Sequence, residues 1–304
     1  METVGFVGLG NMGGAIAANI GAAGYPLIVN DLNEEATRPL LESGARFGAT
    51  PTEVAEGSDV IVTSLPSPRE VELVALGAGG LMSGIGSGKV YVDLTSSHPN
   101  TIRKIGEAFR AKGTEVLDAP LIVGKGGIRE RSVQVLASGD RAAYDRVKPV
   151  LDAFSDTVVY TGELGTGTYI KLAHNLVRRG IGLAIGEGLV LGAKVGVDPS
   201  TLWECMYWGL DTQMHQLRES FAKAVSEPLP DAPATFTLAL SRKDVGLAMD
   251  VAREFDVPMP IAALVEQYMV EGMVRGWGRQ STASLLKLQE EAAGIDFSSR
   301  SGEA

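Results

Sequence analysis

The first 160 residues alternate short apolar runs with segments of helical length, and this alternation restricts the possible folds more than any other feature. Strands that alternate with helices are typical of a parallel sheet covered by helices on both faces. We therefore expect an α/β domain with a doubly wound parallel sheet over residues 1–161. The expected strands are Val4–Val7, Leu27–Asn30, Asp59–Ser64, Lys89–Leu94, Thr114–Asp118, Ser132–Ala137 and Thr157–Tyr160.

The pattern changes after Tyr160, where no convincing strand follows. A long helix is expected over Thr166–Lys194, and further helices over Leu238–Glu254 and Met259–Arg275. The long helix is apolar on nearly every side, and such a helix must be covered on every side. We therefore expect an all-helical substrate and oligomerisation domain over residues 162–304. A homodimer or homotetramer would bury the long helix between subunits.

Composition excludes several classes of function. The formal net charge of −10 over 304 residues argues against nucleic-acid binding, which requires clustered Lys and Arg. Cys205 is the one cysteine, so no intramolecular disulfide forms, as in a reducing compartment such as the cytoplasm. The uncharged run Val4–Asn30 contains seven glycines and a proline, which argues against a membrane span. Cys205, His98 and His215 lack metal-ligand spacing, so no metal is expected.

A glycine-rich loop directly follows the first expected strand and opens a helix. In this G-x-G-x-x-G pattern the first glycine makes a tight turn, the second lets a pyrophosphate approach the backbone, and the third allows close helix–strand packing. A plain glycine-rich turn is the alternative, but strand, helix and second strand all stand in the expected places. The pattern predicts a dinucleotide site at Gly8, Leu9, Gly10, Asn11, Met12 and Gly13.

Asp31 ends the second expected strand, 23 positions after Gly8. A carboxylate there accepts hydrogen bonds from a ribose 2′-hydroxyl and repels a 2′-phosphate. The next four residues include no Arg or Lys that would bind a 2′-phosphate. We therefore expect NAD rather than NADP. Asp31 as the N-cap of the following helix is the alternative interpretation.

With these features in place, the chain resembles the β-hydroxyacid dehydrogenases, the family of 3-hydroxyisobutyrate dehydrogenase. The resemblance spans nearly the whole chain. It implies a Rossmann-like domain of six to eight strands, an all-helical second domain and usually a dimer or tetramer. The matching segments are GFVGLGNMG at Gly5–Gly13, SLP at Ser64–Pro66, DLTS at Asp93–Ser96, DAP at Asp118–Pro120, GTGTYIKLAHN at Gly165–Asn175 and RKDVGLAMD at Arg242–Asp250.

The resemblance also implies roles for individual residues. Lys171 matches the family's catalytic lysine, Asn175 its neighbouring asparagine and Lys243 a lysine near the nicotinamide side of the cofactor. Lys171 and Asn175 are four residues apart, so they share one face of a helix. Burial lowers the pKa of a lysine, which suits acid–base chemistry, whereas a surface lysine that extends to solvent is the alternative. Cofactor-contacting positions are matched by Leu65, Pro66 and Ser96.

The expected substrate loop departs from the family pattern at Ile122-Val123-Gly124. Ile122 replaces a serine that would hydrogen-bond a substrate carboxylate, Val123 replaces a glycine, and Arg131 replaces a glycine farther along. These changes indicate a substrate bulkier or more apolar than hydroxyisobutyrate. Arg178, three residues after Asn175, is our candidate to bind a carboxylate instead. The alternative is that Arg178 or Arg179 pairs with an acid at a subunit interface.

The sequence therefore predicts an NAD-dependent oxidoreductase that acts on the CH–OH group of a 3-hydroxy acid or on a related alcohol/carbonyl pair. Two alternatives remain open. One is a carbonyl or imine reductase on the same scaffold, although imine reductases usually lack lysine at the position of Lys171. The other is a non-catalytic dinucleotide-binding protein, against which the presence of Lys171, Asn175 and Lys243 argues.

Overall fold

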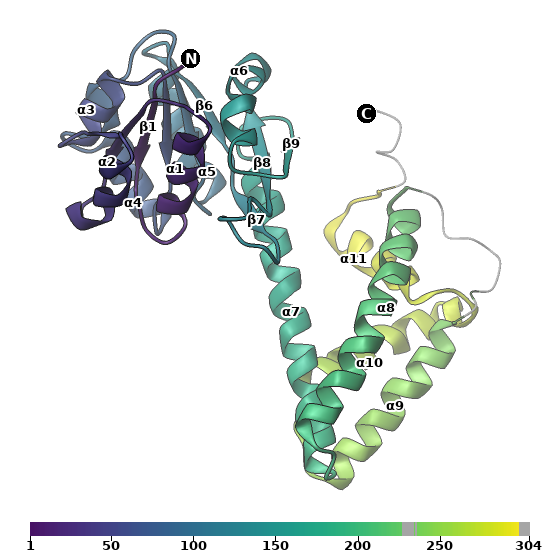
Figure 1. The fold of residues 1–304 in the computed structure, drawn as a ribbon. Coiled ribbons are helices and arrows are strands. Elements are labelled where there is room, and N and C mark those ends of the chain that lie inside the picture. The colour runs from purple at the N-terminus through teal and green to yellow at the C-terminus, as the bar shows by residue number, and fades with distance from the viewer. Residues whose placement is uncertain (227–233, 235, 298–304) are drawn as a thin grey trace. The chain divides into compact units, whose positions relative to one another are not determined.

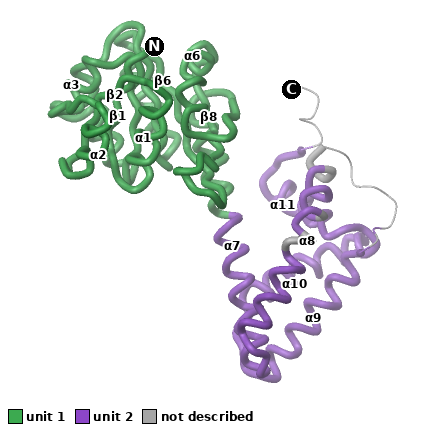
Figure 2. Tube along the Cα trace, viewed as in Figure 1, with its two compact units in different colours: residues 1–176 green, residues 177–304 purple. Residues whose placement is uncertain are grey.

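The structure is a computed structural model that describes residues 1–226, 234 and 236–297. It divides into two compact units, Met1–Leu176 and Val177–Ala304 (Figure 2). The division falls inside the helix that joins the units, so the domain boundary expected at residues 161 and 162 stays a prediction. Each unit is described below by itself.

Unit 1 contains a sheet with helices on both faces (Figure 1). The strand order is β3-β2-β1-β4-β5-β6-β8-β7, and β9 pairs with β8. The first six strands are parallel, while β8 is antiparallel to β6 and β7. The strands are β1 (Val4–Val7), β2 (Leu27–Asn30), β3 (Arg46–Phe47), β4 (Val60–Thr63), β5 (Val90–Asp93), β6 (Glu115–Asp118), β7 (Leu121–Val123), β8 (Val133–Gly139) and β9 (Thr157–Tyr160).

The α/β prediction is confirmed, with two differences in the sheet. One is the antiparallel pairing of β8 with β6 and β7, and the other is the number of strands. The sheet has nine strands rather than the six to eight that the family resemblance implied. The two strands that the sequence did not predict are short: β3 has two residues, both exposed, and β7 has three residues inside the expected substrate loop. Strands of this length carry no recognisable alternation of polar and apolar residues, so pairing with β2 and β8 defines them.

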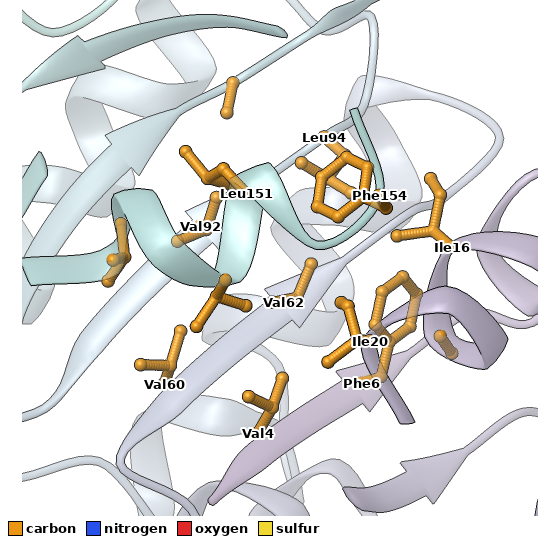
Figure 3. Packing of buried hydrophobic residues seen from close by; sticks show 14 of the residues in the cluster. Val4, Phe6, Ile16, Ile20, Val60, Val62, Val92, Leu94, Leu151 and Phe154 are labelled. Carbon is orange, nitrogen blue, oxygen red and sulfur yellow. The ribbon is translucent and has the colours of Figure 1, made fainter. Parts of the chain in front are cut away.

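Residues on the two sides of each central strand supply two hydrophobic cores. Phe6, Val62 and Val92 pack with Ile16, from the helix that follows β1, and with Phe154 (Figure 3). Alternate strand residues face the opposite core, which also contains side chains of the helices on that face of the sheet. Burial of both faces explains why the central strands are mainly apolar. The helices are α1 (Gly13–Ala22), α2 (Arg38–Glu42), α3 (Pro51–Glu56), α4 (Pro68–Leu76), α5 (Pro99–Arg110) and α6 (Arg141–Asp152), with 3-10 helices η1 (Glu34–Thr37) and η2 (Leu81–Ser83).

Helix α7 (Thr166–Lys194) begins in unit 1 and continues into unit 2, where only helices occur among the described residues. Glu187 of α7 accepts hydrogen bonds from the backbone N–H groups of Ile261 (2.7 Å) and Ala262 (3.0 Å), at the start of α10 (Pro260–Val274). None of the described helices is both long and apolar enough to span a membrane. The others are α8 (Pro199–Ser226), α9 (Leu238–Glu254), α10 (Pro260–Val274) and α11 (Leu286–Ala293), with η3 (Trp277–Arg279) and η4 (Thr282–Leu285).

Candidate active site

The strand order reverses direction between β1 and β4, and this reversal locates the candidate site. The connections from β1 and β4 leave the same edge of the sheet toward opposite sides, which opens a crevice at the carboxyl ends of the strands. The glycine-rich loop follows β1, and Leu65 and Pro66 follow β4. Ser96 follows β5, the next parallel strand. The fold therefore brings the expected cofactor-contacting segments of unit 1 to one edge.

The three glycines have the geometry that their expected roles require. Gly8 has φ +94°, and a Cβ atom there would lie 2.4 Å from the Ser64 carbonyl oxygen. A Cβ at Gly13 would lie 2.0 Å from the Gly8 carbonyl oxygen, so a side chain would separate α1 from β1. At Gly10 no heavy atom lies within 4 Å of that position, which leaves the backbone open to a phosphate. These residues fit a bound dinucleotide.

Asp31 joins the end of β2 to the glycine-rich loop. Its Oδ2 accepts a hydrogen bond from the backbone N–H of Leu9 (2.5 Å), and its Oδ1 accepts one from Asn33 N–H (2.8 Å). The alternative N-cap interpretation is wrong, because Asn33 is the N-cap of η1. A carboxylate has about four acceptor positions, so Asp31 retains capacity for ribose hydroxyls.

Asp93, at the end of β5, is a buried residue to which the sequence analysis gave no role. Its Oδ1 accepts hydrogen bonds from Thr63 Oγ1 (2.9 Å) and from the backbone N–H of Thr95 (3.1 Å). Thr95 Oγ1 in turn accepts a hydrogen bond from Leu65 N–H (3.0 Å). Burial raises the pKa of Asp93 to about 6, against the opposing effect of these hydrogen bonds. Asp93 thus links the loops that carry Leu65 and Ser96.

Lys171 lies one turn into α7 and is half-buried. Its Nζ donates a hydrogen bond to the carbonyl oxygen of Leu121 in β7. This contact disfavours the alternative of a lysine that extends freely to solvent. Asn175, four residues later, is also half-buried, and its Oδ1 lies 3.4 Å from His174 Nδ1. The catalytic roles expected for Lys171 and Asn175 stay predictions.

The expected substrate loop begins as strand β7, in which Ile122 pairs with Gln134 and Val123 with Val133 of β8. Ile122 is half-buried, whereas Val123 and Gly124 are exposed. The loop then turns back, and the N–H of Gly124 donates to the Ser132 carbonyl oxygen (2.8 Å). Pairing with β8 therefore fixes the backbone that presents Ile122 and Val123.

Arg131 replaces a family glycine yet keeps a left-handed backbone, with φ 59°. Its guanidinium donates hydrogen bonds to the carbonyl oxygens of Asp152 (2.6 Å) and Ser155 (3.3 Å) around the end of α6. On the other side of the loop, Asn19 Nδ2 donates to the Ile128 carbonyl oxygen (2.9 Å). These contacts indicate that Arg131 anchors the loop.

Two residues expected at the site belong to unit 2. Arg178 is exposed on α7, and Lys243 of α9 forms an ion pair with Asp244 (Nζ to Oδ1, 3.1 Å). Their expected contacts with substrate and cofactor stay predictions. Among the residues that the structure describes, no group of three or more His, Cys, Asp and Glu side chains is placed to hold a metal ion.

Comparisons with known proteins match both parts of the chain. Residues 3–162 match the family described as the NAD binding domain of 6-phosphogluconate dehydrogenase. Residues 165–289 match the family described as NAD-binding of NADP-dependent 3-hydroxyisobutyrate dehydrogenase.

Individual relatives cover nearly the whole chain. The 2-(hydroxymethyl)glutarate dehydrogenase of Eubacterium barkeri is 31% identical over 297 residues, 97% of each chain. The 3-hydroxyisobutyrate dehydrogenase of Pseudomonas aeruginosa is 32% identical and covers 87% of this chain and 90% of its own. An imine reductase from Myxococcus stipitatus, a V8 variant solved in complex with NAD+, has a TM-score of 0.83. It covers 94% of this chain and 99% of its own at 19% identity, which supports the fold alone.

The family matches agree with the glycine-rich loop and the crevice of unit 1. The chain carries an NAD-binding domain and is an oxidoreductase that transfers hydride to or from a hydroxy-acid or carbonyl substrate. The named relatives are enzymes, which argues against the alternative of a non-catalytic binding protein. The chain therefore belongs to the β-hydroxyacid dehydrogenase family, the family of 3-hydroxyisobutyrate dehydrogenase.

Proposed function

We propose that this enzyme interconverts a 3-hydroxy acid bulkier than hydroxyisobutyrate and its carbonyl product, with Lys171 as the acid–base group. The observation that carries the proposal is the hydrogen bond from Lys171 Nζ to the Leu121 carbonyl oxygen. This contact supports the proposal, because Leu121 belongs to the strand that bears Ile122 and Val123, the residues that depart from the family pattern. The acid–base group and the residues that select the substrate would then lie next to each other at β7.

Each residue has a defined task in this proposal. NAD, when bound, supplies the hydride acceptor or, as NADH, the hydride donor. During oxidation, neutral Lys171 takes the substrate hydroxyl proton, and during reduction its ammonium returns a proton to the carbonyl oxygen. Asn175 orients the lysine or the substrate oxygen, and the family resemblance assigns to Lys243 a role on the nicotinamide side of the cofactor.

The names of two relatives support a substrate that is a 3-hydroxy acid with a variable side group. Hydroxyisobutyrate and 2-(hydroxymethyl)glutarate both place a CH2OH group next to the carbon that bears a carboxylate. They differ at the third substituent, a methyl group in the first and a carboxyethyl group in the second. Ile122 and Val123 supply apolar contacts rather than a hydroxyl donor, which favours a larger apolar substituent. A carbonyl or imine reductase is the second candidate, and Lys171 argues against the imine version.

An initial-rate screen tests both substrate and cofactor. Hydroxy acids of increasing bulk would be oxidised with NAD and with NADP while absorbance of the reduced cofactor is followed. We expect NAD to be preferred, because the Asp31 carboxylate repels a 2′-phosphate. Asp31→Asn removes that charge and keeps an acceptor oxygen for Leu9 N–H, so the preference for NAD should fall about tenfold, or about 1.4 kcal/mol.

Two results of this screen would contradict the proposal. If NADP is used as well as NAD by the unaltered enzyme, the role of Asp31 is wrong. If no hydroxy acid or corresponding aldehyde or ketone reacts while imines are reduced, the second candidate replaces the first.

We further propose a homodimer or homotetramer. Apolar side chains of α7 within unit 2 are uncovered: Leu183 is 63% exposed and Val190 is 55% exposed. Exposed apolar surface of this kind favours burial between subunits. Light scattering at micromolar concentration should show an even assembly, and Leu183→Glu should shift it toward monomer. A monomeric unaltered protein would contradict this proposal.

The proposed location and partners rest on composition. Cys205 as the one cysteine suits the reducing cytoplasm, which subcellular fractionation would test. The net charge of −10 disfavours binding to nucleic acid. A small-molecule substrate is therefore the expected partner.

A further inference from the structure

Asp118 ends β6, and its buried carboxylate holds the start of α7. Oδ1 accepts a hydrogen bond from the backbone N–H of Gly165 (2.8 Å), and Oδ2 accepts one from Thr168 N–H (2.7 Å). Ser138 Oγ of β8 donates to Oδ1 and accepts a second bond from Gly165 N–H (3.1 Å). The N–H groups at a helix N-terminus lack partners within the helix, and a carboxylate also complements the helix dipole.

The backbone of the first turn of α7 also lies against the sheet. A Cβ atom at Gly167 would lie 2.2 Å from the Leu136 carbonyl oxygen of β8 and 3.2 Å from Asp118 Oδ2. Only a residue without a side chain permits this approach. The close contact and the two hydrogen bonds to Asp118 leave the start of α7 little freedom to shift along or away from the sheet.

Lys171 makes a second contact between α7 and the segment of chain that begins at Asp118. It lies three residues after Thr168, so the two residues share one face of α7. Its Nζ donates to the carbonyl oxygen of Leu121, which lies three residues after Asp118. The short segment 118–121 therefore accepts hydrogen bonds from α7 at two points, the N-terminus of the helix and Lys171.

We propose that Asp118 is a positioning residue that sets where Lys171 Nζ lies relative to β7. The inference rests on the proposed acid–base role of Lys171. Proton transfer requires near-ideal placement of donor and acceptor, and a shift of about 1 Å can cost about 10²-fold in rate. A loosened helix start would move Lys171 relative to Ile122 and Val123, while the glycine-rich loop on β1 would be unaffected.

The test uses Asp118→Asn, because the amide keeps the shape but offers one acceptor oxygen for two N–H donors. We expect kcat to fall at least tenfold while the Kd for NAD changes less than twofold. In the Lys171→Ala background the same change should lower kcat less than twofold, because Asp118 acts through Lys171. Residual rates would be measured at high enzyme concentration.

Asp140→Asn is the matched control. Asp140 is an exposed N-cap whose carboxylate accepts from Ala143 N–H (2.8 Å), on α6, which carries no expected site residue. Asparagine keeps the one acceptor oxygen that Ala143 N–H uses, so this replacement should leave kcat unchanged and affect the Tm little. If Asp118→Asn fails to fold, Ser138→Ala removes the hydroxyl that braces the carboxylate and should lower kcat about threefold with the same dependence on Lys171.

The outcomes separate this inference from the proposed function. A fully active Asp118→Asn or Ser138→Ala enzyme, beside an inactive Lys171→Ala enzyme, would overturn the positioning role alone. The positioning role would also be overturned if Asp118→Asn lowers kcat equally in the unaltered enzyme and in the Lys171→Ala background. A Lys171→Ala enzyme that keeps most of its activity would overturn the acid–base assignment, and this inference with it.

Discussion

Replacing Lys171 with alanine is expected to lower kcat by about 10²- to 10⁴-fold, the usual contribution of a positioned acid–base group. NAD binding should be retained, because the glycine-rich loop and Asp31 form the cofactor crevice at β1 and β2 independently of the lysine side chain. Fluorescence titration with NAD and single-turnover rates on the best substrate would measure the two effects separately.

Two further variants distinguish proton transfer from charge alone. Lys171→Arg keeps a positive charge, but a guanidinium cannot lose its proton in a protein, so oxidation should be about as slow as in the alanine variant. Lys194→Ala removes an exposed lysine from the end of the same helix and should leave kcat unchanged. An active Lys171→Arg enzyme would show that charge, and not proton transfer, is what this position supplies.

The sequence predicted those elements that a local pattern of residues specifies. The bounds of β1, β2 and β9, and of helix α7, match the expected ranges. β1 and β2 are short, buried and mainly apolar runs, whereas β9 was recognised from its β-branched residues and α7 from its length and high apolar content. The role of the first glycine in the glycine-rich loop could also be predicted from a local feature. A turn with φ +94° at Gly8 is a local backbone constraint, which the residue type itself reveals.

Contacts between distant segments could not be predicted in the same way. Asp31 at the end of the second expected strand also allowed an N-cap interpretation, yet its closest donor is Leu9 N–H, 22 residues earlier. Asp118 accepts from donors 47 and 50 residues later. No periodicity in a single sequence encodes such pairings, so the motifs containing Asp93 and Asp118 were visible but the structural roles of these residues were not.

Strand β7 illustrates the same limit at the substrate side of the site. Leu121–Val123 has three residues, and its partner β8 begins ten residues after it ends. The sequence showed that Ile122 and Val123 depart from the family pattern. The structure adds that pairing with β8 and the anchor at Arg131 hold this segment in place. Any change of substrate preference at Ile122 should therefore come from side-chain chemistry and not from loop rearrangement.

The second large effect is expected from replacing a residue that recognises the substrate. Ile122 offers no hydroxyl donor, so a substrate carboxylate needs another partner, and we propose Arg178, which is exposed on α7. A guanidinium binds a carboxylate through two parallel charge-assisted hydrogen bonds. Loss of a hydrogen bond to a charged group costs about 1.5–3 kcal/mol, so Arg178→Ala should lower kcat/KM for an acidic substrate about 10- to 100-fold. A neutral analogue of the same size should change less than twofold.

Arg179→Ala is the matched control, since Arg179 is the exposed neighbour on the same helix and should affect neither substrate. Ile122→Ser restores the hydroxyl that the family pattern places there, and it should raise kcat/KM for small hydroxy acids relative to bulky ones. The measurement is kcat/KM for a matched acid and neutral pair in all three variants. If Arg178→Ala slows the acid and the neutral analogue equally, Arg178 does not bind the carboxylate. The alternative, that Arg178 or Arg179 pairs with an acid at a subunit interface, then predicts that replacing the pairing arginine weakens the assembly seen by light scattering.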